Sequence, residues 1–182
     1  MKLPAAVPDS RCMVWEEFEV ATTDDAREAI NRFHRSPAAK HLSALGIDYG
    51  IAPHAKGVRS AEEFARAARI PLDRVFKTML LKDFGGKHFL LICPAAERVD
   101  FDRLRERFGA KPTLAKRDEV SAATGYEPNS VSPFGIKRQL PLYADSRLFH
   151  GDRVYLGSGT PRIDIEITTQ SVFEALQPIC IV

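Results

Sequence analysis

The residue with the clearest chemical potential in this sequence is Lys77, which lies in the apolar run VFKTMLL of residues 75–81. The run has the composition of a β-strand, and both rows of side chains around the lysine are largely apolar. This pattern indicates a strand that is buried on both faces, where an isolated ammonium group is too costly to retain. Lys77 therefore needs a polar partner or a cavity. The alternative is that the lysine reaches solvent from a strand end or from an edge strand.

A carboxylate with similar potential lies in the run RIDIEIT of residues 162–168. Isoleucines alternate there with Asp164, Glu166 and Thr168, which is typical of an antiparallel strand with one face in the core. The polar face then lies either in water or against a cleft. In the second case, Asp164 is placed to pair with Lys77 or to orient a substrate.

Two loop segments carry residues that shape the backbone. The segment TGYEPNSVSPFGIK of residues 124–137 has neither helical nor strand periodicity, but it is rich in apolar side chains. Its two prolines fix φ, so we expect a stiff, half-buried loop in which Gly135 lets the backbone approach a ligand closely. A second turn, Gly157-Ser158-Gly159, could expose backbone amides to an anion or a carbonyl oxygen. The alternative is an ordinary turn, because the sequence of a phosphate-binding P-loop is absent.

The histidines and cysteines do not form a recognisable metal-binding pattern. None of the five histidines belongs to an HxxxH or HExxH pair, and the three cysteines are far apart in the chain. The serine motif GxSxG of many hydrolases is also missing. We therefore expect neither a metal ion nor another cofactor.

Composition limits the classes of partner. The chain has 182 residues, 45% of them hydrophobic, and a formal net charge of +2. A nucleic acid would therefore have to bind a local patch, and the basic run of residues 101–117 is one candidate, although most such runs are solvated helix faces. The N-terminal segment lacks the apolar core of a signal peptide, and no apolar run approaches the roughly 18 residues of a membrane span. We expect a cytoplasmic protein that does not enter a membrane.

The elements that must position these residues alternate irregularly between helix and strand. This order favours an α+β fold, with a mixed, barrel-like sheet surrounded by helices, over a doubly wound fold. We predict a hairpin over residues 75–93, whose turn contains two glycines. Periodicity and capping residues predict helices over residues 22–35, 37–45, 60–70, 100–109, 116–125 and 169–176. Further strands are predicted over residues 12–20, 47–54, 140–145, 153–159 and 162–168.

Three of these segments occur in a familiar order. RVFKTMLLKD, TGYEPNSVSPFGIKRQLPLYAD and GSGTPRIDIEIT together resemble the YbaK/ProX/EbsC family of aminoacyl-tRNA deacylases, which are related to the editing domain of bacterial prolyl-tRNA synthetases. The resemblance covers about residues 37–177. It implies an editing domain over residues 37–182, preceded by an N-terminal extension of a strand and a helix over residues 1–36.

The resemblance also implies roles for particular residues. It implies catalytic roles for Lys77 and Asp164. Many relatives carry two glycines where this chain has Asn129 and Ser130, so the amino-acid preference of the pocket is expected to differ. The substrate-binding residues implied by the same motifs are Tyr126, Asn129, Ser130, Val131, Ser132, Pro133, Phe134, Gly135, Gly157, Ser158 and Gly159.

The function implied by the resemblance is trans-editing. The expected substrate is tRNA(Pro) carrying alanine, cysteine or another small amino acid, and prolyl-tRNA synthetase is a candidate partner. A small pocket would exclude proline by size, as the second sieve of double-sieve editing does. Two alternatives stay open, namely a module that binds tRNA or a synthetase without catalysis, and a hydrolase of small-molecule esters.

Overall fold

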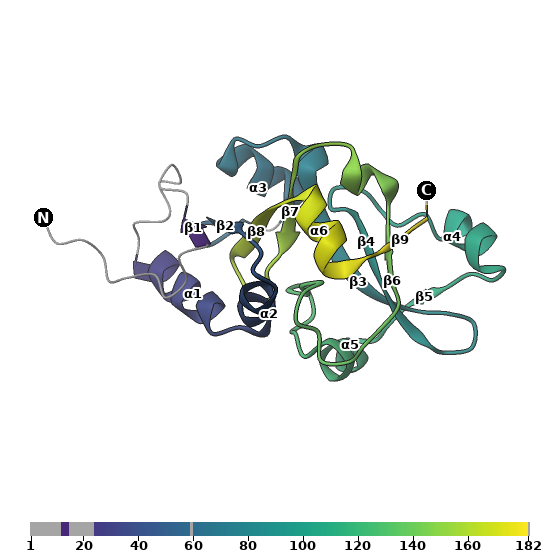
Figure 1. Ribbon diagram of the computed structural model, residues 1–182. Helices are drawn as coiled ribbons and strands as arrows, with labels where there is room; N and C mark the ends of the chain where they lie inside the picture. Colours follow the sequence, from purple (N-terminus) through teal and green to yellow (C-terminus); the bar gives the residue numbers. More distant parts are fainter. Residues whose placement is uncertain (1–11, 15–23, 59, 182) are drawn as a thin grey trace, which may run out of the picture.

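The computed structural model describes residues 12–14, 24–58 and 60–181, which fold into one mixed β-sheet with helices packed around it (Figure 1). The described helices are α1 (Asp24–His34), α2 (Pro37–Leu45), α3 (Ala61–Ala68), α4 (Phe101–Phe108), α5 (Arg117–Thr124) and α6 (Thr169–Leu176), with 3-10 turns η2 (Leu72–Arg74) and η3 (Ser146–Phe149). The described strands are β1 (Cys12–Val14), β2 (Tyr49–Pro53), β3 (Val75–Lys82), β4 (His88–Pro94), β5 (Thr113–Leu114), β6 (Leu142–Ala144), β7 (Arg153–Gly157), β8 (Ile163–Thr168) and β9 (Ile179–Cys180).

The sheet contains both parallel and antiparallel pairs. Its order is β1-β2-β8-β7-β3-β4-β6-β9, and β5 also pairs with β3. Strand β3 is antiparallel to β4 and parallel to β7, so the centre of the sheet is mixed. In Figure 1, α1 lies at one end of the described part of the molecule and α4 lies at the other. The predicted α+β architecture is confirmed.

Most of the predicted elements are present with similar bounds. Each helix predicted from residue 24 onward is found, as is the hairpin of β3 and β4. The strand predicted over residues 12–20 is found at Cys12–Val14, and residues 15–20 lie outside the described part of the chain. The short strands β5 and β9 and the two 3-10 turns were not predicted.

Capping residues explain why several helices begin and end where they do. Ser36 Oγ accepts a hydrogen bond from the amide of Ala39 at the start of α2, and Ser60 Oγ accepts one from Glu63 at the start of α3. Asp100 performs the same task for α4 through Oδ1. These caps use only local sequence, and for this reason the helix starts could be predicted.

Strand β3 packs against hydrophobic clusters on both faces, but Lys77 and Met79 in its middle are only half-buried. Phe76 and Leu80 belong to the main hydrophobic core, which β3 shares with β7, β8 and the loop before β6. Leu81 belongs to a second cluster beneath α4, and Val75 belongs to a third cluster beneath α3. The middle of the strand is therefore partly open on the face of Lys77.

The described part of the predicted N-terminal extension packs on the same sheet. Phe33 of α1 is fully buried in the main core, and its ring meets the ring of Tyr49 edge-on at 5.8 Å between centroids. Strand β1 adds to the sheet by pairing in parallel with β2. The described residues of this segment thus contribute to the hydrophobic core.

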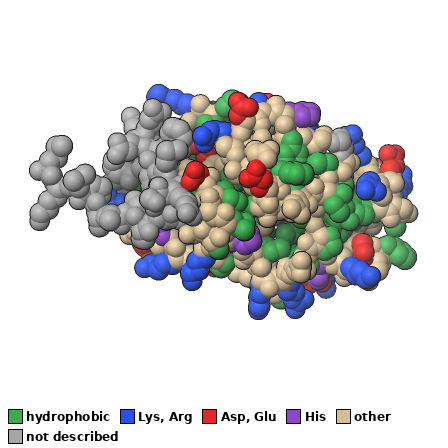
Figure 2. All heavy atoms as spheres, viewed as in Figure 1, with side chains coloured by type: hydrophobic (Ala, Val, Ile, Leu, Met, Phe, Trp, Pro, Cys, Tyr) green, Lys and Arg blue, Asp and Glu red, His purple; other side chains and the backbone are tan. Residues whose placement is uncertain are grey.

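Charges are mixed on the surface. On the face shown in Figure 2, lysine and arginine side chains are interspersed with aspartate and glutamate. This distribution agrees with the small net charge and directs attention to local patches. None of the helices that the structure describes is long and apolar enough to cross a membrane.

Candidate active site

A groove of about 940 Å³ lies beside β3, where the pairing of that strand is interrupted. On the edge that faces away from β4, β7 pairs with Val75 and Phe76, whereas β5 pairs with Leu81 and Lys82. Residues 77–79 between these two pairings line the groove and have no partner strand on this edge among the described strands. The groove therefore lies at the gap that β7 and β5 leave between them along this edge of β3.

Lys77 lies in this gap, and two carbonyl groups hold its ammonium group. Nζ donates to the carbonyl oxygens of Ala95 at 3.2 Å and Glu97 at 2.6 Å. Both carbonyls belong to the segment after β4, which the amide of Ala95 ties to β3 by a 2.9 Å hydrogen bond to the Val75 carbonyl. An ammonium group has three N–H donors, so one donor remains for a ligand in the groove. The sequence-based requirement for a polar partner is met by the main chain.

Asp164 lies on the groove wall beside a histidine. Its Oδ2 is 3.1 Å from Nε2 of His54, and both side chains are less than one-fifth exposed. An ionised carboxylate only accepts hydrogen bonds, so Nε2 carries the hydrogen of this pair. The His54 ring also packs against the ring of Phe64 at 4.9 Å between centroids. Asp164 therefore fixes the orientation of an imidazole at the edge of the groove.

Of the two roles considered for Asp164, the structure does not show the pairing with Lys77. The register of β2 and β8 places Ala52 opposite Asp164, which brings His54 alongside the carboxylate, while the carbonyls after β4 hold Lys77. Of the two alternatives for the polar face of β8, the structure favours a cleft over open water, because Asp164 lines the groove. Glu166 on that face is only 5% exposed, and its carboxylate lies 3.6 Å from the guanidinium of Arg153.

A tight turn of the loop after α5 forms another wall. The amide of Ser130 donates to the carbonyl of Glu127 at 3.0 Å, and Asn129 has φ of 74°. Pro128 before a residue of positive φ is the arrangement of a type II turn, in which glycine or asparagine is favoured at this position. Asn129 therefore adopts the conformation that a glycine would otherwise supply.

The rest of this loop is buried and cross-linked, as the stiff-loop prediction required. The hydroxyl of Tyr126 donates to the carbonyl of Phe134 at 2.6 Å, and both residues lie in the core. Burial raises the pKa of the Tyr126 hydroxyl above its usual value, so the hydroxyl stays protonated and continues to donate. These contacts hold the groove wall from within.

The glycines of both predicted loops allow neighbouring segments of the chain to pack closely against the loop backbone. A Cβ on Gly135 would meet the main chain of Pro37, and one on Gly159 would meet the Tyr126 ring. A Cβ on Gly157 would lie 2.8 Å from the carbonyl oxygen of Val131. Gly135 lies outside the groove lining, and the close approach that the structure shows at this glycine is to α2.

The structure brings only some of the predicted site residues to the groove. Those that line it are Lys77, Asp164, Asn129, Ser130, Val131 and Gly157. The others lie outside the lining, and several of them are buried supports of the two loops: Tyr126, Ser132, Pro133, Phe134, Gly135, Ser158 and Gly159. The Ser158 hydroxyl, for example, donates to the carbonyl of Thr160 and accepts from its amide.

Sequence reasoning missed several polar residues of the groove lining, and four of them bear on its chemistry. The Thr78 hydroxyl is buried in the groove wall with no hydrogen-bond partner among the described residues. Arg98 and Arg117 are exposed at the groove, and within the described ranges their guanidinium groups make no ion pair. His54 is the fourth, and its position as the last residue of the strand predicted over residues 47–54 was the only signal that could have found it.

The described part of the chain shows no metal cluster, and Cys93 is not an activated cysteine. No group of three or more His, Cys, Asp or Glu residues there is arranged to hold a metal ion. Burial raises the pKa of Cys93 to about 11, so this thiol is protonated near neutral pH and does not act as a thiolate nucleophile.

Sequence comparisons place this site in a known context. The model of the aminoacyl-tRNA editing domain matches residues 55–174. The uncharacterized protein YwhH of Bacillus subtilis is 26% identical over 115 residues, which cover 63% of this chain and 73% of YwhH. EbsC of Enterococcus faecalis, named provisionally as a deacylase of Cys-tRNA(Pro) and Cys-tRNA(Cys), is 25% identical over 62% of this chain and 70% of its own. A proline–tRNA ligase of Staphylococcus aureus is 27% identical over 78% of this chain but only 24% of the ligase.

Solved structures share the fold. The hypothetical protein APE2540 aligns with a TM-score of 0.72 and 23% identity over 80% of this chain and 97% of its own. A protein described provisionally as a trans-editing enzyme for prolyl-tRNA synthetase aligns with a TM-score of 0.71 and 23% identity, over 80% and 95% of the two chains. The family match begins just after β2, ends within α6, and includes the strand of Lys77 and both groove loops, so this chain belongs to the family of aminoacyl-tRNA editing domains.

Proposed function

We propose that this protein hydrolyses the ester bond between a wrongly attached amino acid and its tRNA, and that the reaction takes place in the groove beside β3. The observation that carries the proposal is Lys77, whose ammonium group is held by two carbonyls and keeps one donor for the groove. Family membership supports the choice of substrate class. Asp164 and His54 are proposed to shape the opposite wall.

The proposed chemistry needs a positioned ester and stabilisation of negative charge. Water adds to the ester carbonyl carbon, the bond to the ribose oxygen breaks, and that oxygen takes up a proton as the amino acid leaves. The free N–H of Lys77 would stabilise the carbonyl oxygen as its charge develops, which is the type of contact that lowers such barriers most.

We propose tRNA(Pro) carrying alanine, cysteine or another small amino acid as the substrate, and prolyl-tRNA synthetase as the partner that supplies it. The provisional name of EbsC and the similarity to part of a proline–tRNA ligase support this choice. We further propose that residues 37–182 form the editing domain and that residues 1–36 are an extension of it.

A deacylation panel tests this substrate assignment. We expect the protein to release alanine, cysteine or serine from tRNA(Pro), and to act at least roughly 100-fold more slowly on Pro-tRNA(Pro), because the pocket excludes the larger ring. Equal rates on every aminoacyl-tRNA would contradict the size filter. Saturable tRNA binding without turnover would instead indicate a binding module, and hydrolysis of free aminoacyl esters at the same rate would indicate a small-molecule hydrolase.

The exposed arginines at the groove are expected to bind phosphates near the 3′ end of the tRNA. Replacing both, Arg98→Ala with Arg117→Ala, should raise KM for aminoacyl-tRNA about tenfold and leave kcat nearly unchanged. Each phosphate contact to a single strand contributes about 0.7 to the slope of log affinity against log salt, so the double variant should reduce that slope by about 1.4.

A matched control uses two exposed basic residues that do not line the groove. The pair Lys40→Ala with Arg138→Ala removes the same formal charge and should leave both KM and the salt slope within twofold of wild type. If the control pair weakens binding as much as the groove pair, the general charge of the protein binds the tRNA and the assignment to Arg98 and Arg117 is wrong.

A further inference from the structure

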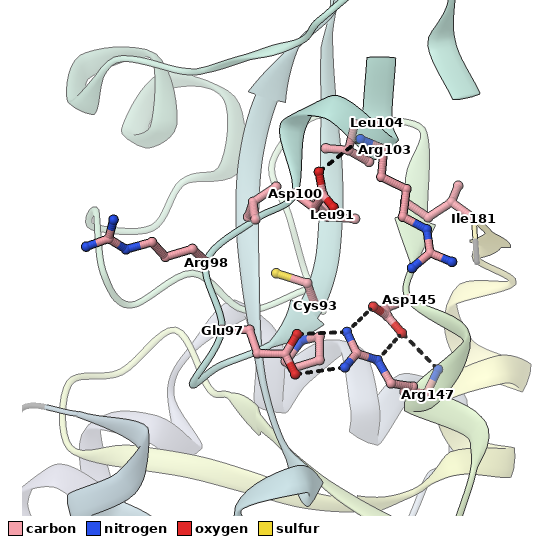
Figure 3. Close-up of a pocket in the computed structure, with 12 residues that line it drawn as sticks. Leu91, Cys93, Glu97, Arg98, Asp100, Arg103, Leu104, Asp145, Arg147 and Ile181 are labelled. Carbon is pink, nitrogen blue, oxygen red and sulfur yellow. Dashed lines mark hydrogen bonds and ion pairs between the residues drawn. The ribbon is translucent and has the colours of Figure 1, made fainter. Parts of the chain in front are cut away.

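A second cavity, of about 370 Å³, is lined in part by an arginine held between two carboxylates (Figure 3). Arg147 Nη1 and Nη2 donate to the two carboxylate oxygens of Glu97 at 2.8 and 3.0 Å. Its Nε and Nη2 also donate to the two oxygens of Asp145 at 2.9 and 2.8 Å. The guanidinium plane is thus engaged on two sides, which fixes its position more firmly than a single contact would.

Asp145 anchors this arrangement to the sheet. It is only 8% exposed, and its amide donates to the carbonyl of Ile92 in β4 at 2.9 Å. Burial opposes ionisation of the carboxyl, but hydrogen bonds from the Arg147 side chain and amide outweigh it, so the pKa of Asp145 lies below its usual value. The same hydrogen bonds, first from Asp145 and then from Glu97, raise the pKa of Arg147. The ion pair therefore persists at neutral pH.

Glu97 connects this anchor to the candidate active site. Its carboxylate is bound by Arg147 in the second cavity, while its main-chain carbonyl accepts the 2.6 Å hydrogen bond from Lys77 Nζ in the groove. Glu97 is exposed, and its amide makes only a long 3.4 Å bond to the carbonyl of Pro94. The two hydrogen bonds from Arg147 to the Glu97 carboxylate are therefore the main restraint on the position of the Glu97 main-chain carbonyl.

We propose that Arg147 is a positioning residue for Lys77. Anchored by Asp145, it fixes Glu97, whose carbonyl orients the ammonium group so that the third N–H faces the groove. The inference rests on the proposed function of the groove. Because the Arg147 and Glu97 side chains are 44% and 55% exposed, their ion pair contributes little to overall stability, and its main effect is on local geometry.

The expected kinetic effect is specific. Arg147→Met keeps the apolar stem but removes both bidentate contacts, and it should lower kcat for deacylation about tenfold while KM stays within twofold. Glu97→Gln leaves the main chain intact and one oxygen for Arg147, so it should lower kcat about threefold. In a Lys77→Ala background, Arg147→Met should cause no further loss, because it acts through Lys77.

Arg103→Met is the matched control. Arg103 lines the same cavity but lies apart from Glu97, and Figure 3 shows its side chain on the far side of Asp145. This variant should keep kcat within twofold of wild type. A tenfold loss in Arg103→Met, or a full additional loss from Arg147→Met in the Lys77→Ala background, would overturn the inference.

NMR of the lysine ammonium groups separates this inference from the proposed function. A protected ¹H–¹⁵N signal from Lys77, identified by its loss in Lys77→Ala, should disappear in Arg147→Met and persist in Arg103→Met. A signal that persists in Arg147→Met overturns the positioning role, whatever the rates are. A signal that behaves as expected in a protein without deacylase activity retains the positioning role and refutes the proposed function.

Discussion

Gly135→Ala is expected to lower the melting temperature by about 6–12 °C, the largest loss of stability that we predict for a single methyl group. Gly135 has φ of 63°, where a Cβ is strained by roughly 1–2 kcal/mol. The added Cβ would also lie under 3.0 Å from main-chain atoms of Pro37 and Ala38, which cannot rotate away. Together, strain and overpacking should cost about 3 kcal/mol, and each kcal/mol corresponds to about 2–4 °C in a domain of this size.

Gly86→Ala is the control that measures the cost of backbone strain without overpacking. Gly86 has φ of 78° in the turn between β3 and β4, and a Cβ there would meet nothing within 4 Å. We expect this variant to lose about 2–4 °C, which reflects strain of about 1 kcal/mol. Thermal unfolding of both variants measures the difference. Equal losses would show that the contact between the Gly135 loop and α2 is less tight than described.

Features that depend on short stretches of chain could be predicted from the sequence. The caps at Ser60 and Asp100 and the glycine turn of the β3–β4 hairpin each use residues within a few positions of one another. The strands β5 and β9 could not be predicted, because each has two residues and exists only through pairing with a distant strand.

The sequence predicted a site residue only where the residue type and its immediate neighbours were sufficient to indicate a role. A lysine in a strand with two apolar faces needs a partner, and Lys77 has one. The identity of that partner depends on a carbonyl 20 residues away, and the pairing of His54 with Asp164 spans 110 residues. The same reason applies to Gly135, because the sequence indicates that another segment comes close to this glycine but does not identify that segment as α2.

Lys77→Ala is the second prediction with a large effect. Removal of a preorganised charge from the position where an oxyanion develops should lower kcat by roughly 100-fold to 1,000-fold. KM should change little, because the phosphate contacts proposed for Arg98 and Arg117 are made in both ground and transition states. Thermal stability should be nearly unchanged, since the side chain is only half-buried and its partners are carbonyls near solvent.

Lys82→Ala is the matched control on the same strand. Lys82 is also half-buried, but it pairs with Glu119 at 3.0 Å and does not line the groove. This variant should retain deacylation within twofold of wild type. A comparable loss in Lys82→Ala would mean that the activity responds to disturbance of β3 rather than to the ammonium group in the groove.

The single-turnover rate of deacylation of mischarged tRNA(Pro), measured with wild type and Lys77→Ala side by side, tests the central claim most directly. The account predicts that wild type releases at least one of alanine, cysteine and serine, and that Lys77→Ala does so at least 100-fold more slowly while still binding the tRNA. Wild-type rates in Lys77→Ala across all the mischarged tRNAs would contradict the account.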